Sequence, residues 1–158
     1  MCIRDSYMYN ELKNIKVPTT IMTNSAENNG NIFGAVDYLN HKKDIINTGV
    51  TIKEYEGGIS YHGKSMTIDD DIAIVGSFNM DMRSAYIDTE LMLVINSKDI
   101  NKQLKASMEE YEKKAATVKN ETEYSHIPEG MKMKELSDKK KNIKAWFGWA
   151  MNGLRFLF

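Results

Sequence analysis

The sequence predicts an α/β fold in which a mixed β-sheet is flanked by helices and an amphipathic helix ends the chain. Short β-rich runs such as residues 18–23 and 50–55 alternate with helical stretches, which favours strands and helices packed in layers. From residue 143 onwards, apolar side chains recur at the spacing of one helical face. At 158 residues, the chain has the length of one domain with its own core.

The first expected elements are a helix, a strand and a second helix. Residues 7–15 resemble the last turns of a helix, whereas residues 1–6 (MCIRDS) show no periodicity and are expected to be a prefix foreign to the fold. Residues 18–23 are β-rich and lead into a polar loop. Apolar side chains over residues 31–47 recur at helical spacing, and Gly49 supplies a stop signal.

Four further strands are expected, each an apolar or alternating run bounded by glycine or a polar turn: residues 50–55, 59–68, 72–75 and 87–96. The three aspartates of residues 69–71 predict the turn between the second and third of these. Ser97 is expected to cap a polar amphipathic helix that runs to about residue 119.

The composition changes after Asn120. Residues 121–142 contain Pro128 and Gly130 and are interpreted as a linker between a domain of residues 7–120 and a helix of residues 143–158. The linker ends in a lysine-rich stretch, and the helix carries two tryptophans. Such a helix either packs on the domain or lies in a membrane interface near anionic lipid, and the pattern fits both.

Composition excludes several kinds of site. A formal net charge of −1 gives no reason to expect general attraction to nucleic acid. Cys2 is the only cysteine and there are three histidines, which leaves little room for a metal cluster, so neither a metal nor another cofactor is expected. There is no apolar run of about 18 residues that could form a transmembrane helix, and no signal-peptide pattern at the N-terminus.

The segment His62-Gly63-Lys64 is the strongest chemical signal in the chain. On a strand, side chains two positions apart face the same way, so His62 and Lys64 are expected to share one space. Two adjacent cations repel each other in a core, but the pairing suits a site that holds an anion. Lys64 would hold a phosphate oxygen, and His62 would be free to attack phosphorus.

Three downstream residues could support this pair. Ser77 and Asn79 follow an apolar strand and could donate hydrogen bonds to the same phosphate. A nucleophilic imidazole needs its second nitrogen held by an acceptor, and Glu90 is the candidate for that role. Asp69 lies at a turn with the opposite side-chain parity, so we expect little contact between Asp69 and substrate.

The spacing His62-x-Lys64-x4-Asp69, with Gly76-Ser77-x-Asn79 and Glu90 downstream, resembles the phospholipase D superfamily. The run of residues 76–84, the later Thr89-Glu90-Leu91 and the upstream Thr23-Asn24-Ser25 are similar to the second half of bacterial cardiolipin synthase-like members. The resemblance covers residues 10–115 and implies a phospholipase D-like half-domain. It implies phosphodiester transfer or hydrolysis through a phosphohistidine, with Asp69 completing the catalytic motif.

The same resemblance implies a phospholipid substrate, a membrane surface and an association with the bacterial cytoplasmic membrane. His62 would be either the nucleophile or the general acid, and both roles stay open. Because the family uses two such motifs and this chain has one, the chain is interpreted as the C-terminal piece of a longer enzyme whose other half, or a partner chain, supplies the second motif.

Two alternatives remain. Small single-motif members of the superfamily are homodimeric nucleases, although the missing first strand, the lipid-branch character of residues 76–91 and the lack of a basic surface argue against nucleic acid as a partner. A catalytically inactive binding module is the third possibility, and the intact motif residues argue against it.

Overall fold

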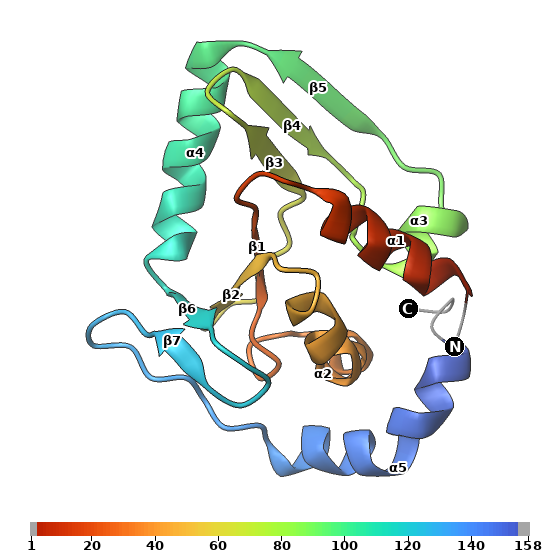
Figure 1. The fold of residues 1–158 in the computed structure, drawn as a ribbon. Helices are drawn as coiled ribbons and strands as arrows, with labels where there is room; N and C mark the ends of the chain where they lie inside the picture. The colour runs from red at the N-terminus through yellow and green to blue at the C-terminus, as the bar shows by residue number, and fades with distance from the viewer. Residues whose placement is uncertain (1–2, 155–158) are drawn as a thin grey trace.

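The protein is described by a computed structural model that covers residues 3–154 (Figure 1). Its elements are α1 (Ile3–Asn14), β1 (Thr20–Asn24), α2 (Ile32–Ile46), β2 (Thr51–Tyr55), β3 (Ser65–Ile68), β4 (Ile72–Gly76), α3 (Met82–Tyr86), β5 (Met92–Asn96), α4 (Lys98–Glu112), β6 (Ala115–Val118), β7 (Tyr124–His126) and α5 (Asp138–Leu154). Within these residues the strands form two sheets, one of four strands and one of three.

The four-stranded sheet has the strand order β1-β2-β6-β7 and is mixed. β1 and β2 are parallel, because α2 connects them as a crossover, while β6 pairs antiparallel with β2 and with β7. Its core comes from the helix and the two central strands: Ala35 and Val36 of α2, Ile52 and Tyr55 of β2, and Ala115 and Ala116 of β6 are buried. The predicted α/β class, with a mixed sheet flanked by helices, is confirmed.

The second sheet has the order β3-β4-β5 and is antiparallel throughout. Helix α4 runs beside this sheet and reaches β6 at its C-terminal end (Figure 1). Asn101 of α4 is 1% exposed and donates a hydrogen bond of 2.6 Å to the backbone carbonyl of Ile72. Ala73, on the same strand, is completely buried. One helix therefore connects both sheets.

Several element boundaries differ from those expected. The strand predicted over residues 59–68 begins only at Ser65, and the strand predicted from residue 87 begins at Met92. The helix predicted to reach residue 119 ends at Glu112 and is followed by β6. The prediction was wrong there because pairing with β2, Tyr55 opposite Ala115 and Glu54 opposite Ala116, overrides the helix propensity of a lysine- and alanine-rich stretch.

Both ends of the chain contain more regular structure than expected. Helix α1 begins at Ile3, inside the segment interpreted as a foreign prefix, and the origin of that segment stays a prediction. Residues 121–142, interpreted as a linker, include β7 and the first turn of α5. The division of the chain into half-domain, linker and terminal helix also stays a prediction.

Helix α5 packs along α2 (Figure 1). The side-chain amide of Asn40 donates a hydrogen bond of 3.0 Å to the backbone carbonyl of Gly148. Trp146 is 83% exposed, and the later apolar positions of the predicted stripe lie outside the side chains that the structure describes. Among residues 3–154, no helix combines the length and the apolar character that crossing a lipid bilayer requires.

Candidate active site

His62 and Lys64 lie in the segment that precedes β3, and their side chains are in contact. The Lys64 ammonium is 2.8 Å from Nδ1 and 3.2 Å from Nε2 of His62, and it donates a further hydrogen bond of 2.9 Å to the His62 carbonyl. A neutral imidazole offers one accepting nitrogen to such a donor. The His62 side chain is exposed to solvent. The structure thus brings the two residues together as predicted, but through a loop instead of a strand.

Ser77 and Glu90 meet where β4 ends and β5 begins. The Ser77 hydroxyl donates to the Glu90 carboxylate and accepts a hydrogen bond of 3.1 Å from the Leu91 amide. The Ser77 amide donates to the Leu91 carbonyl at 3.0 Å. This close approach requires Gly76, because a Cβ there would lie 2.1 Å from the Leu91 carbonyl oxygen.

The electrostatic environment connects Glu90 to Lys64. The pKa of Glu90 is held below its ordinary value by hydrogen bonds from the hydroxyls of Ser77 and Ser84 and, to a lesser degree, by the positive charge of Lys64. The backbone carbonyl of Lys64 accepts a hydrogen bond of 3.1 Å from the Gly76 amide, which joins the two segments. Glu90 is therefore an ionised carboxylate beside the histidine–lysine pair. Its described hydrogen bonds go to serines, and its role in orienting His62 stays a prediction.

Asn79 belongs to the same cluster through the short helix α3. Asp81 caps this helix by accepting a hydrogen bond of 2.7 Å from the Ser84 amide. The Asn79 side-chain amide lies 3.4 Å from the buried hydroxyl of Ser84, which in turn acts on Glu90. Asn79 is thus linked to Glu90 through Ser84, and its role in binding phosphate stays a prediction.

Asp69 lies at the opposite end of β3 from Lys64. It occupies the turn between β3 and β4 and has a positive φ of 47°. Its backbone carbonyl accepts a hydrogen bond from Lys105, which also forms an ion pair of 2.7 Å with Asp70. The structure therefore links Lys64 both to His62 and, through its charge, to Glu90, which Ser77 contacts directly. Asp69 is separated from these residues. A catalytic role of Asp69 stays a prediction.

Asn24 enters the sequence analysis only as part of the family resemblance, and the structure places it in contact with the residue before His62. It accepts a hydrogen bond of 2.7 Å from the Tyr61 amide and donates one of 2.8 Å to the Tyr61 carbonyl, immediately before His62. The Tyr61 ring packs against Tyr111, with 4.6 Å between the ring centroids. An amide residue directly after a β-run is the sequence signal that could have identified this contact.

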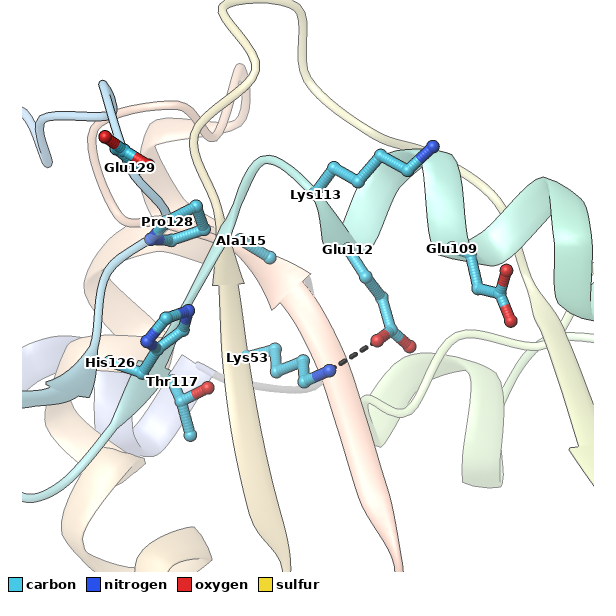
Figure 2. A pocket seen from close by; sticks show the side chains of 9 residues that line it. All are labelled: Lys53, Glu109, Glu112, Lys113, Ala115, Thr117, His126, Pro128 and Glu129. Atoms are coloured by element: carbon cyan, nitrogen blue, oxygen red, sulfur yellow. Dashed lines mark hydrogen bonds and ion pairs between the residues drawn. The ribbon is translucent and has the colours of Figure 1, made fainter.

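A hollow of about 530 Å³ lies away from this cluster, between β6, the segment after β7 and the end of α4 (Figure 2). Lys53 and Glu112 form an ion pair across it. His126 lines the same hollow and faces Thr117. Within residues 3–154, no three His, Cys, Asp or Glu side chains gather as metal ligands would.

The chain is similar to known proteins over the segment that contains the cluster. Residues 6–111, more than half of the chain, match the family described as "Cardiolipin synthase, PLD-like domain". Cardiolipin synthase A of Wigglesworthia glossinidia brevipalpis is 35% identical over 68 residues, which are 43% of this chain and 14% of that protein. Cardiolipin synthase A of Yersinia pseudotuberculosis serotype O:1b is 33% identical over 78 residues, 49% of this chain and 16% of that protein.

Among solved structures, the phospholipase D family member Nuc from Salmonella typhimurium aligns with a TM-score of 0.47 and 15% identity, over 72% of this chain and 90% of that one. The alignments to the cardiolipin synthases span only 14% and 16% of their length. From its match over residues 6–111, the chain belongs to the family of the cardiolipin synthase PLD-like domain.

Proposed function

We propose that this chain provides one half of an active site that transfers a phosphatidyl group between alcohols, or to water, through a phosphohistidine. The contact between the Lys64 ammonium and the His62 ring, at 2.8 Å, carries this proposal. Ser77 donates a hydrogen bond to Glu90, and the charge of Lys64 helps to keep that carboxylate ionised. An anionic phosphodiester bound there would meet a cation, a hydroxyl and an imidazole on one surface.

In the proposed reaction, one imidazole nitrogen attacks phosphorus while the bond from phosphorus to the leaving alcohol oxygen breaks. The leaving oxygen takes a proton from a second histidine, which acts as the general acid. An acceptor alcohol or water then attacks phosphorus, gives its proton back to that histidine, and the phosphorus–nitrogen bond breaks. His62 is one of these two histidines, with its role left open, and the other comes from a second motif in a longer protein or in a partner chain.

The remaining residues have supporting roles in this proposal. Lys64, Ser77 and Asn79 bind the phosphate oxygens and stabilise the charge that develops on them, so the reaction needs no cofactor. Glu90 orients the imidazole and balances the charge of Lys64. The names of the cardiolipin synthase A relatives support a phospholipid substrate at a membrane surface.

The test uses the longer protein that contains this chain, incubated with a radiolabelled phosphodiester lipid. We expect an acid-labile label on histidine. His62→Asn would abolish the label if His62 is the nucleophile, and would slow labelling of the other histidine if His62 is the acid. His126→Asn is the matched control, because His126 is exposed and lies in the separate hollow of Figure 2. An acid-stable label would contradict the mechanism.

Contact with a membrane is a separate part of the proposal and has its own test. Trp146 projects from α5 with 83% of its surface exposed, as an interfacial anchor would. The chain should float with vesicles that contain anionic lipid, and Trp146→Ser should float less. Equal flotation of both forms would exclude an interfacial role for this face of α5.

A further inference from the structure

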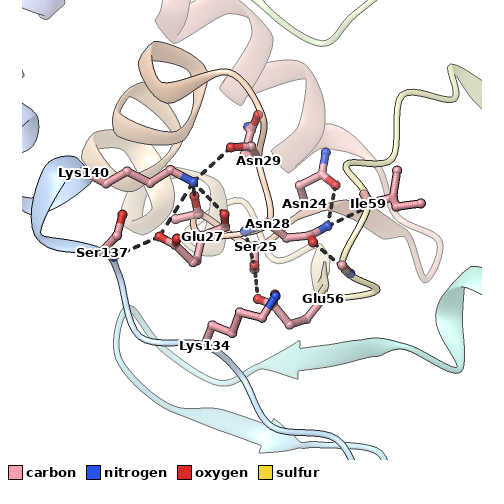
Figure 3. Close-up of polar contacts among 12 residues, drawn as sticks. Asn24, Ser25, Glu27, Asn28, Asn29, Glu56, Ile59, Lys134, Ser137 and Lys140 are labelled. Atoms are coloured by element: carbon pink, nitrogen blue, oxygen red, sulfur yellow. Dashed lines mark hydrogen bonds and ion pairs between the residues drawn. The ribbon is translucent and has the colours of Figure 1, made fainter.

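The segment that leads to His62 is held by two asparagines, Asn24 at the end of β1 and Asn28 in the loop that follows (Figure 3). Asn24 exchanges two hydrogen bonds with the backbone of Tyr61, at 2.7 and 2.8 Å. Asn28 is buried, accepts a hydrogen bond of 3.0 Å from the Gly58 amide and donates one of 3.2 Å to the carbonyl of residue 59. The course of the backbone before His62 thus depends on where residues 24–29 are held.

The opposite side of this loop is held by α5. Lys140 is only 7% exposed, and its ammonium donates to the backbone carbonyls of Ala26 at 2.8 Å, Glu27 at 2.6 Å and Asn29 at 3.0 Å. An ammonium has three N–H donors, so these carbonyls use all of them. A buried lysine is tolerated only with such partners.

A second contact supports the same junction. The Glu27 carboxylate accepts a hydrogen bond of 2.9 Å from the Ser137 amide at the start of α5, and it lies 3.7 Å from the Lys140 ammonium. Hydrogen bonds from the Ser137 amide and then its hydroxyl, followed by the charge of Lys140, hold the pKa of Glu27 below its ordinary value. The carboxylate is therefore charged near neutral pH and complements the buried lysine.

We propose that Lys140 is a positioning residue for His62: α5 fixes loop 24–29, and that loop fixes the backbone of residues 58–61. The contacts themselves do not depend on the proposed function; the proposed function only gives the position of His62 its importance. Lys140 lies beyond residues 6–111, the segment that matches the family, so this is a feature of the chain outside the matched region.

The test measures amide hydrogen exchange by NMR in the full chain. Lys140→Met keeps an unbranched side chain, one atom shorter, and removes its donors. Lys139→Met is the matched control because Lys139 is an exposed neighbour on α5. We expect exchange at Tyr61 and Gly58 to become at least about tenfold faster in Lys140→Met only, since those amides bond to the loop. The ring signals of His62 should shift in the same variant.

The Ser97 amide is the internal reference, because it bonds at 2.7 Å to the Asp71 carbonyl beside the other sheet. Unchanged exchange at Tyr61 and Gly58 would overturn the proposal, and so would equal acceleration at Ser97, which indicates a purely global effect on stability. If Lys140→Met does not fold, the milder Glu27→Gln decides, with a smaller acceleration expected at the same two amides. None of these readouts needs catalysis, so the proposed function and this inference can fail separately.

Discussion

Replacing Lys42 by methionine would remove one member of the buried ion pair that joins α2 to β2. The Lys42 ammonium is 2.7 Å from the Glu54 carboxylate, and the two side chains are 6% and 3% exposed. Tyr38 donates a hydrogen bond of 2.6 Å to the same carboxylate, and Tyr124 of β7 donates another. Burial and then the charge of Glu54 raise the pKa of the Tyr38 hydroxyl, so it stays a protonated donor.

The loss of stability in Lys42→Met depends on the hydrogen-bond donors that still surround the Glu54 carboxylate. Breaking a buried pair by removing one partner costs about 3–5 kcal/mol, because it leaves an uncompensated charge. The two tyrosine donors remain, and hydrogen bonds to a charged group contribute about 1.5–3 kcal/mol each. We therefore expect Lys42→Met to lower the free energy of unfolding by the smaller value of that range, about 3 kcal/mol. For a domain of this size that corresponds to a fall in Tm of about 6–12 °C.

Thermal unfolding followed by circular dichroism measures this change. Lys43→Met, on the exposed face of α2, is the matched control and should stay within about 0.5 kcal/mol of the parent. The double variant Lys42→Met with Glu54→Gln removes both charges, keeps an acceptor oxygen for the tyrosine hydroxyls, and should recover part of the lost stability. A fall in Tm below about 2 °C for Lys42→Met alone would refute the view of Glu54 as a buried charge that depends on Lys42.

Three further outcomes are expected. Ser77→Ala removes the first hydrogen-bond donor to Glu90, so an NMR titration of that carboxyl should show its pKa rising towards the ordinary value. The pKa of Glu27 is lower in the folded protein than its ordinary value of 4.5, so its contribution to stability is complete above pH 4.5 and is lost as the pH falls through the lowered pKa. The urea midpoints of the parent and Glu27→Gln should therefore differ near about pH 6 and converge near about pH 2. Asn101→Leu leaves the Ile72 carbonyl without its donor and should cost about 1–3 kcal/mol in urea unfolding, a change too small to measure being the contrary result.

Sequence patterns were most informative where local signals and tertiary contacts agree. The helix at residues 31–47 was predicted from its apolar spacing and its stop, and the structure adds an Asn31 cap and a positive φ of 89° at Gly49. β6 was missed because its residues favour a helix and become a strand only through pairing with β2.

In the candidate site too, contacts between residues close in the sequence could be predicted and contacts between distant segments could not. The association of His62 with Lys64 could be predicted because the two residues are close in the sequence. Glu90 is expected to hold His62, whereas its described hydrogen bonds come from serines. The contact of Asn24 with Tyr61 joins residues 37 positions apart in the sequence. The amide after the β-run therefore marks Asn24 as a candidate, but no pattern indicates its partner. The start of the strand predicted over residues 59–68 has no strand partner, because the Ile59 carbonyl and the Tyr61 amide bond to the side chains of Asn28 and Asn24.

The position of β6 has a practical consequence for anyone who expresses part of this protein. A fragment cut at residue 111, where the family match ends, would lack the strand that lies between β2 and β7. The backbone of Lys53 to Tyr55 would become an open sheet edge, a template for aggregation. Glu54 would also lose Tyr124. A cloning boundary chosen from sequence similarity alone would therefore cut through the core, and a workable fragment has to extend through α5.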